Sequence, residues 1–176
     1  MKRLESSAKT PEFTEQFEQL YAQYADDVLR MAYFYLADKQ KAEDVCQDVF
    51  IKLYTRGENI APGREKAWLL RVTVNCCRDH WRSAWLKRVV LGAPSLDIMP
   101  AQDETIEQRE EKAELMRAIH KLPAAFRETI LLQYYQGLGI AEIAQMLDLP
   151  EGTISSRLSR ARKKLESLLK EEATGE

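Results

Sequence analysis

Residues that break helices are scarce in this chain, which has only 7 glycines and 6 prolines among its 176 residues. No stretch alternates apolar and polar residues over the length of a strand, so we predict an all-α fold with long helices and few turns. The sequence also contains no run of 18 apolar residues and no N-terminal apolar segment of the signal-peptide type. We therefore expect neither direct insertion into a membrane nor export.

Cysteine and histidine are also scarce, with three and two residues respectively. The odd set Cys46, Cys76 and Cys77 lacks the spacing of a disulfide framework, which indicates a reducing, cytoplasmic compartment. A metal or redox sensor built from these cysteines and His80 is one alternative, and stoichiometric zinc in the purified protein would favour it. Because no paired CxxC motif is present, small buried thiols beside a surface histidine are the better interpretation. We predict no metal and no cofactor.

Catalytic groups show no arrangement typical of an enzyme. The two histidines are far apart in the sequence, and neither a serine–histidine–aspartate set nor a glycine-rich phosphate loop is evident. The carboxylates fall on polar helical faces or in the linker. We predict a binding protein that is not an enzyme.

The net charge of −2 is unexpected for a protein that binds DNA by itself. This charge is unevenly distributed, because residues 64–88 sum to +5, residues 97–114 to −5 and residues 151–164 to +4. Two basic patches therefore flank an acidic connector. The alternation of basic and acidic segments indicates the kind of partner better than the net charge of the whole chain does.

Apolar residues at helical spacing organise the N-terminal half. The first stripe follows Pro11 and reads as core: Phe13, Phe17, Leu20, Tyr21, Tyr24, Val28, Leu29, Ala32, Tyr35 and Leu36. Asp38 is placed to cap a second helix, whose buried stripe is Ala42, Val45, Cys46, Val49 and Leu53. The opposite face of that helix is polar and displays Glu43, Asp44, Gln47, Asp48 and Lys52. We expect the helix to end at Gly57, with residues 55–65 forming a loop.

A longer helix is predicted from about Glu65 to Trp85, with Trp68, Leu69, Val72 and Cys76 facing inward. Its remaining surface interleaves basic, polar and aromatic residues: Arg71, Asn75, Arg78, His80, Trp81, Arg82 and Trp85. Single-stranded nucleic acid binds such surfaces because cations neutralise phosphates and flat rings stack on unstacked bases. The helix is therefore a candidate for single-stranded DNA binding.

Residues 89–104 lose helical periodicity and contain Pro94 and Pro100, so we place an interdomain linker there. Two small helical domains then occupy residues 11–88 and 105–170. Two apolar stripes are predicted at the start of the second domain: Leu115, Ile119 and Leu122, then Phe126, Ile130 and Tyr134.

The most specific pattern lies between Gly139 and Leu169. A short helix with Ile140, Ile143, Ala144 and Leu147 on one face is followed by a break at Asp148–Pro150 and a second helix with Ile154, Leu158, Ala161, Leu165 and Leu168 buried. The free face of the second helix carries serines, arginines and lysines. This register predicts a helix-turn-helix whose second helix enters the major groove. An ordinary helical hairpin with a solvated basic face is the alternative.

Three segments, in this order, carry a family resemblance: AEDVCQDVFIKLY, WLLRVTVNCCRDHWRS and KLPAAFRETILLQYYQGLGIAEIAQMLDLPEGTISSRLSRARKKL. Together with the acidic linker they resemble a bacterial RNA polymerase sigma factor of the short, extracytoplasmic-function group. The resemblance covers roughly Phe13 to Leu169. It implies a protein that binds core RNA polymerase, recognises the −10 and −35 promoter elements and promotes DNA melting, and it makes an anti-sigma factor an expected partner.

The resemblance also implies roles for individual residues. The residues expected to contact core polymerase are Asp44, Gln47 and Asp48. Those expected at the −10 DNA are Arg71, Asn75, Arg78, Trp81 and Arg82, where Asn75 matches a position that contacts an extruded base and the loop of residues 55–65 forms its pocket. Those expected at the −35 DNA are Thr153, Ser155, Ser156, Arg157, Ser159 and Arg160. Ser155 stands where many members carry Lys or Arg, and Ser159 is smaller than in some members, so the −35 sequence preferred by this chain does not follow from the family.

Two hypotheses remain beside this interpretation. A helix-turn-helix regulator that acts without polymerase would bind duplex DNA alone. The acidic connector could also fold back on the basic patches and keep the free protein off DNA; its acidic residues are Asp97, Asp103, Glu104, Glu107, Glu110, Glu111 and Glu114.

Overall fold

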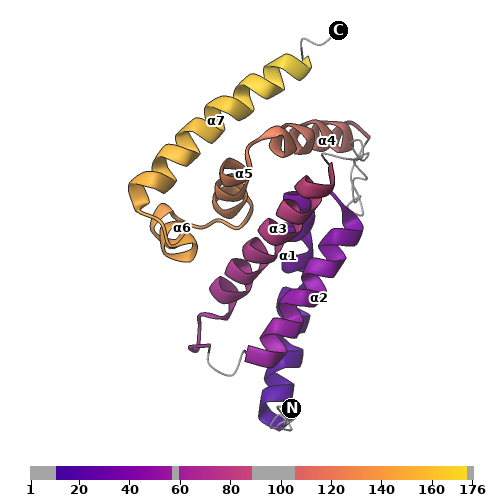
Figure 1. Cartoon of the computed structure of the whole chain (residues 1–176), viewed down its shortest axis with the longest axis vertical. Coiled ribbons are helices and arrows are strands. Elements are labelled where there is room, and N and C mark those ends of the chain that lie inside the picture. Colours follow the sequence, from indigo (N-terminus) through magenta and orange to yellow (C-terminus); the bar gives the residue numbers. More distant parts are fainter. Residues whose placement is uncertain (1–10, 57–59, 89–105, 174–176) are drawn as a thin grey trace.

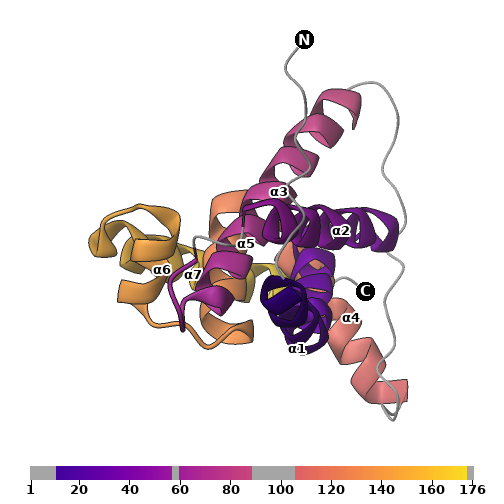
Figure 2. The same cartoon turned by 90° about the horizontal axis from the view of Figure 1, so that it is seen from below.

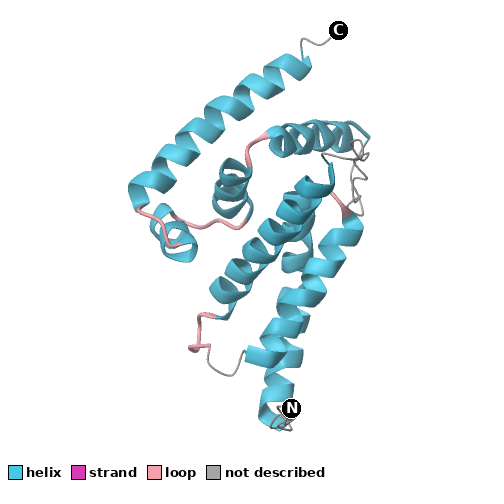
Figure 3. Ribbon diagram, in the orientation of Figure 1, coloured by secondary structure: helices cyan, strands magenta, loops and turns pink. Residues whose placement is uncertain are grey.

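The computed structural model describes residues 11–56, 60–88 and 106–173, and every regular element in these ranges is a helix. This confirms the all-α prediction (Figure 3). The predicted linker, residues 89–104, and the predicted helix end at Gly57 lie outside the described residues. Within the described ranges, none of the helices combines the length and apolar character that a bilayer crossing requires.

The described N-terminal half is a bundle of α1 (Pro11–Leu36), α2 (Lys39–Arg56) and α3 (Glu65–Arg88), each packed against the other two (Figures 1 and 2). Ala37, with φ of 55°, ends α1 in the left-handed region, and its N–H donates to the Tyr33 carbonyl at 2.8 Å. Asp38 Oδ1 then accepts a hydrogen bond from the Lys41 N–H at 3.0 Å, which confirms the predicted cap. Partial burial opposes ionisation of Asp38, but the hydrogen bonds from Lys41 outweigh it and lower the pKa of the carboxyl.

The core of this bundle follows the predicted stripes closely. Ala42, Val45, Val49 and Leu53 of α2 are buried, and Cys46 is half-buried. On α3, Leu69 and Cys76 are buried, while Trp68 and Val72 are half-buried.

The placement of Tyr21 in the core was wrong. Half of its surface is exposed (50%), and its ring lies edge-on to Phe50 with the centroids 4.7 Å apart. Phe17 packs edge-on against the same Phe50 and against Tyr54, so these rings form an aromatic patch at the margin of the core.

The described C-terminal half consists of α4 (Ile106–Lys121), α5 (Ala124–Ile130), the π-helical turn η2 (Leu131–Tyr135), α6 (Ile140–Leu147) and α7 (Glu151–Ala173). α7 packs against α4, α5 and α6. The buried centre of this half is apolar and comprises Met116, Ala118, Ile119, Leu122, Leu132, Ile143, Ile154, Leu158 and Ala161.

The structure corrects both stripes predicted at the start of this half. Leu115 is 41% exposed, because Met116 rather than Leu115 continues the buried face toward Ile119 and Leu122. Tyr134 is 59% exposed, because the chain widens into a π turn in which the Gln136 N–H donates to the Leu131 carbonyl at 3.1 Å. The wider turn rotates Tyr134 off the face that an α-helix would give it, and Leu131 and Leu132 are buried instead.

The acidic connector is also corrected in part. Glu107, Glu110, Glu111 and Glu114 belong to helix α4 and not to a flexible tether. The other acidic residues of the connector, Asp97, Asp103 and Glu104, lie outside the described residues. The hypothesis that the connector folds back and keeps the free protein off DNA stays a prediction. The four glutamates in α4 no longer belong to the flexible segment that it assumed.

The two halves pack against each other. α1 contacts α4 and η2, α3 contacts α6, and the buried side chains of both halves form one continuous cluster. At this junction Phe34 of α1 meets Tyr135 of η2 edge-on, with ring centroids 4.6 Å apart. The N-terminal bundle and the helix-turn-helix are therefore held in one defined arrangement.

Candidate nucleic-acid interface

The acidic face of α2 is exposed at Asp44, Gln47 and Asp48. These side chains lie opposite the buried Val45 and Val49, as the helical period requires. Asp48 Oδ2 lies 3.8 Å from His80 Nε2 of α3, beside a hollow of about 260 Å³. All three residues predicted to bind core polymerase are thus available at one surface.

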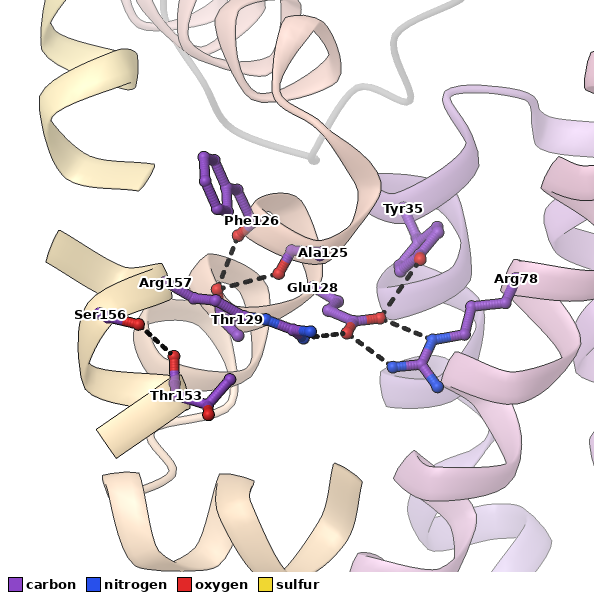
Figure 4. A network of polar contacts seen from close by, with 9 residues as sticks. All are labelled: Tyr35, Arg78, Ala125, Phe126, Glu128, Thr129, Thr153, Ser156 and Arg157. Carbon is purple, nitrogen blue, oxygen red and sulfur yellow. Dashed lines mark hydrogen bonds and ion pairs between the residues drawn. The ribbon is translucent and has the colours of Figure 1, made fainter. Parts of the chain in front are cut away.

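The stripe of α3 predicted to bind the −10 element splits into two groups. Arg71, Asn75 and Arg82 are exposed, and their spacing puts them on one side of the helix. Trp81 is half-buried and packs on the apolar core. Arg78 is only 35% exposed, and its guanidinium points into the junction between the two halves (Figure 4).

The described part of the loop before α3 faces α6. Ile60, Ala61, Gly63 and Arg64 line a hollow of about 500 Å³ together with Trp68, Arg71, Leu138, Glu142, Gln145 and Met146. Arg64 Nη1 lies 3.5 Å from Gln145 Oε1 across this hollow. Residues 60–64 of the loop predicted to form a base pocket therefore lie against the first helix of the helix-turn-helix.

Local chemistry explains the turn between α6 and α7. Gly139 immediately precedes α6, and its N–H donates to the Glu142 carboxylate at 2.8 Å. After α6, Asp148 has a φ of 55°, in the left-handed region that Asp tolerates better than most residues. The Leu149 N–H donates to the Ala144 carbonyl at 3.0 Å, which completes the end of the helix. The Pro150 carbonyl then accepts the N–H groups of Thr153 and Ile154. The predicted helix-turn-helix is confirmed.

α7 separates its residues as predicted. Ile154, Leu158, Ala161 and Leu168 are buried, and Leu165 is half-buried. Of the six residues predicted to bind the −35 element, Ser155, Ser156, Ser159 and Arg160 are exposed and Thr153 is half-buried. The Ser156 hydroxyl donates to the Thr153 carbonyl at 3.0 Å within the helix.

Arg157 is directed inward and differs in this from its neighbours on α7. Its side chain is 25% exposed, and Nη1 lies 3.5 Å from the carboxylate of Glu128 on α5. Arg157 and Arg78, predicted to contact two different promoter elements, therefore meet the same carboxylate.

Glu128 is the centre of a polar cluster that consists of Tyr35, Arg78, Glu128 and Arg157 (Figure 4). Its side chain is 2% exposed and accepts two hydrogen bonds from Arg78, from Nε at 2.8 Å and from Nη2 at 2.6 Å. The Tyr35 hydroxyl donates at 3.4 Å. Such a bidentate, charge-assisted pair is among the strong polar contacts of proteins.

Burial and the neighbouring charges shift the pKa values of Tyr35 and Arg78. Burial, followed by the negative charge of Glu128, raises the pKa of the Tyr35 hydroxyl. The hydrogen bond to Glu128 raises the pKa of Arg78. Tyr35 is therefore a neutral donor, and Arg78 stays charged.

A second polar contact anchors α5 and α4 to the end of α1. Arg127 is buried and donates from Nη1 to the Tyr35 carbonyl at 2.8 Å, from Nε to Ile119, and from Nη2 to the carbonyls of His120 and Leu122. A cation suits this position, because the last carbonyls of a helix lack partners within it and carry partial negative charge.

His120 contacts the same end of α1, with Nε2 2.8 Å from the Phe34 carbonyl. Burial, helped by the charge of Arg127, lowers the pKa of His120 to about 4. The neutral ring therefore donates from Nε2, and its buried Nδ1 has no hydrogen-bond partner among the described residues.

Two of the three cysteines fit the interpretation as buried thiols, and Cys46 is half-buried. Cys76 and Cys77 are buried, and desolvation raises the pKa of Cys77. The Lys52 ammonium donates to Cys76 Sγ at 3.1 Å. Within the described ranges, no group of three or more His, Cys, Asp or Glu side chains is arranged to hold a metal ion.

Comparison with known proteins identifies the two halves. Residues 20–87 match the family Sigma-70 region 2, and residues 112–165 match the family Sigma-70, region 4. The ECF RNA polymerase sigma factor SigM of Mycobacterium tuberculosis is 32% identical over 154 residues, which cover 87% of this chain and 76% of SigM. The chain belongs to the extracytoplasmic-function sigma factors.

Two further comparisons agree with this family. The ECF RNA polymerase sigma factor SigE of Mycolicibacterium smegmatis is 33% identical over 157 residues, covering 87% of this chain but only 61% of SigE. The solved structure of the sigma factor RpoE from Bartonella quintana, in complex with the anti-sigma factor NepR, superposes with a TM-score of 0.71 at 28% identity, covering 89% of this chain and 98% of that one. The fold of this sigma factor is thus shared with a member of similar length.

The prediction of the site missed Glu128 and the residues around the end of α1. Glu128 lies within FRETILL, where both its neighbours along the helix are buried in the structure. Two adjacent charged residues, Arg127 and Glu128, stand here in an otherwise largely apolar segment, and such a pattern indicates a buried ionic contact. The partners Tyr35 and Arg78 are 93 and 50 residues away, so spacing alone does not reveal them.

Proposed function

We propose that this sigma factor binds core RNA polymerase, brings it to promoters through their −10 and −35 elements, and promotes melting of the DNA at the start site. Residues 11–88 contact core polymerase and the −10 element, residues 89–104 connect the domains, and residues 105–170 contact the −35 element. Polymerisation is performed by the partner, so the chain itself acts as a specificity subunit without catalysis or cofactor.

The observation that carries the proposal for the −35 element is the geometry of α7. Its apolar residues face the domain core, while Ser155, Ser156, Ser159 and Arg160 are exposed just after the turn. In helix-turn-helix proteins the N-terminal part of the second helix contacts base edges in the major groove. Arg pairs with guanine O6 and N7, and Ser donates to or accepts from several bases.

For the −10 element the proposal rests on α3. Arg71, Asn75 and Arg82 form an exposed stripe in which a single amide lies between cations. The amide of Asn75 both donates and accepts, as a base edge requires, while the arginines neutralise phosphates. Extruding a base from the duplex costs on the order of a few kcal/mol, which these contacts and the polymerase must offset.

Core polymerase is proposed to contact Asp44, Gln47 and Asp48 on α2. A short acidic surface suits a basic partner surface, where electrostatic complementarity favours specificity and rapid association. Because RpoE of Bartonella quintana was solved with an anti-sigma factor, we propose a partner of that class here too. These partners imply a cytoplasmic protein without direct insertion into the membrane.

Binding to core polymerase tests the first step. A labelled chain titrated with core enzyme should bind, and the double substitution Asp44→Lys with Asp48→Lys should weaken binding at least tenfold, since both carboxylates lie on the proposed contact. The matched control is Glu15→Lys with Glu18→Lys, two exposed carboxylates of α1, which should leave the affinity nearly unchanged. Equal losses in both variants would contradict the assignment of α2.

Promoter binding separates this proposal from a regulator that acts alone. In a gel-shift assay the sigma factor should retain a promoter fragment strongly only when core polymerase is present. Equally strong and sequence-specific binding without polymerase would favour the regulator.

A further inference from the structure

The buried carboxylate of Glu128 joins the two halves of the molecule in a way that the proposed function does not require. Glu128 belongs to the region 4 half, and two of its three partners, Tyr35 and Arg78, belong to the region 2 half. The third partner, Arg157, comes from the recognition helix α7. Figure 4 shows the carboxylate between the two guanidinium groups.

The contact with Arg78 depends on the closed arrangement. A carboxylate that is 2% exposed has lost its hydration, and a charge in that position is tolerated only when it is paired and hydrogen-bonded. If the halves separated, Glu128 would lose the bidentate contact with Arg78 and the hydrogen bond from Tyr35. The pair therefore stabilises closure and makes it specific for one arrangement.

Closure also engages groups that the proposed function assigns to DNA. Arg78 lies on the α3 stripe, and a guanidinium binds a carboxylate and a phosphate with the same planar geometry. In addition, Arg64 of the loop before α3 contacts Gln145 of α6, and Arg71 lines the hollow between α3 and α6. Region 4 thus lies over part of the surface proposed for the −10 element.

We propose that the Glu128 cluster is an intramolecular latch that holds the free sigma factor closed. Glu128 occupies the guanidinium group of Arg78 where a DNA phosphate would bind, and opening of the latch frees Arg78 before the promoter is engaged. Arg157 lies in the same half as Glu128 and holds the carboxylate in position. Core polymerase, which must hold the two domains at separate promoter elements, opens it. The identity of the DNA-contacting residues rests on the proposed function, whereas the closure itself does not.

Small-angle X-ray scattering of the full chain tests the closure without DNA. Glu128→Gln keeps the size of the side chain but removes the charge, so the radius of gyration should rise and the scattering should indicate separated domains. The matched control is Glu166→Gln, which removes the same charge from the same half at an exposed pair with Lys170. Its scattering should remain that of the unchanged chain.

A second variant keeps the test valid if Glu128→Gln does not fold, which circular dichroism would detect. Arg78→Lys retains the positive charge but loses the bidentate geometry, and it leaves region 4 unaltered. It should also increase the radius of gyration. If the folded variants scatter like the unchanged chain, the latch does not exist.

Polymerase-free binding to a promoter duplex tests the competition with DNA. If closure leaves about a tenth of the chains competent, Glu128→Gln should bind on the order of tenfold more tightly, because apparent affinity scales with the competent fraction. Glu166→Gln should gain only what one lost negative charge explains. Open scattering with no gain in DNA binding over this control would overturn the competition at Arg78. A failed proposed function would instead appear as missing transcription with core polymerase, whatever the scattering shows.

Discussion

Among individual side chains, Arg160 and Arg157 should differ in effect although both lie on α7. Arg160 is exposed, so Arg160→Ala should weaken binding to the −35 element by about 1–3 kcal/mol, the cost of a lost bidentate base contact. Arg157 is engaged with Glu128 of the same half, so it contacts DNA only after this ion pair is broken. Arg157→Ala should therefore weaken binding to the −35 element less than Arg160→Ala does.

The measurement for both arginines is transcription by the reconstituted polymerase from a promoter that depends on its −35 element. Arg162→Ala, at an exposed position of the same helix C-terminal to the six residues proposed to contact the −35 element, is the control. Unchanged transcription in both the Arg160 and the Arg157 variant would remove the assignment of this face.

Asn75 should act in melting more than in initial binding. Asn75→Ala removes an exposed amide between Arg71 and Arg78, so open-complex formation should fall while binding to the −35 element is retained. Permanganate footprinting of unpaired thymines measures the difference. Normal melting would contradict the role, and a lowered melting temperature of the protein would indicate that Asn75 braces the fold instead.

His120 predicts a pH dependence of stability. Its pKa lies at about 4 in the folded chain, against an ordinary value of 6.5, because the ring is buried and Arg127 faces it. As pH falls from 6.5 toward 4 the unfolded chain takes up a proton that the folded chain excludes, so the free energy of unfolding declines across this window, by about 2–3 kcal/mol at most. Well above pH 6.5 the ring is neutral in both the folded and the unfolded chain, so the histidine contributes no slope.

Urea denaturation at several pH values checks this dependence. His120→Gln retains a donor for the Phe34 carbonyl but does not titrate, so its stability should fall less steeply with acid. Identical slopes in the two proteins would show that other groups dominate.

The exposure of a side chain could be predicted from the sequence only where that side chain points away from the other domain. Asp44, Asn75, Ser155 and Arg160 are exposed as the helical period predicts. The period does not reveal that Arg78 and Arg157 meet at Glu128, because that contact joins residues far apart in the chain. The DNA and polymerase roles of the exposed residues stay predictions.

Among the helices, the turn between α6 and α7 depends on the left-handed conformation of Asp148. A β-branched residue is strained there, so Asp148→Val should destabilise the protein by about 1–2 kcal/mol. Asp148→Gly should be close to neutral, since glycine adopts this conformation without strain. Thermal denaturation of the two variants measures the difference, and equal melting temperatures would contradict a backbone origin.

Helices were predictable where an apolar stripe persists. The cap at Asp38, the buried faces of α2 and α7 and the break at Asp148 follow from local chemistry. The π turn at Leu131–Tyr135 does not, because a stripe at spacing i, i+4 assumes α-helical geometry throughout. The misplacement of Tyr134 has this cause.

For the molecule as a whole, the order of the two domains follows from the sequence pattern, but their packing does not. The net charges of the segments predicted that the acidic connector, residues 97–114, is attracted to the basic segments 64–88 and 151–164. In the described residues the contacts between the halves instead include those of Glu128, Arg127 and His120, the pair of Phe34 with Tyr135, and Arg64 with Gln145. A single buried charge changes the net charge of a segment little, although such groups determine how the two halves pack.

Run-off transcription with core RNA polymerase on genomic fragments tests most directly the claim that this chain directs polymerase to promoters. We expect defined transcripts only when the chain is added to core enzyme, with start points that share one pair of −10 and −35 sequences. Arg160→Ala should reduce transcripts that depend on the −35 sequence, and Asn75→Ala should reduce all transcripts that require melting. Absence of any transcript above core enzyme alone, from a chain that is folded and binds the polymerase, would contradict the account.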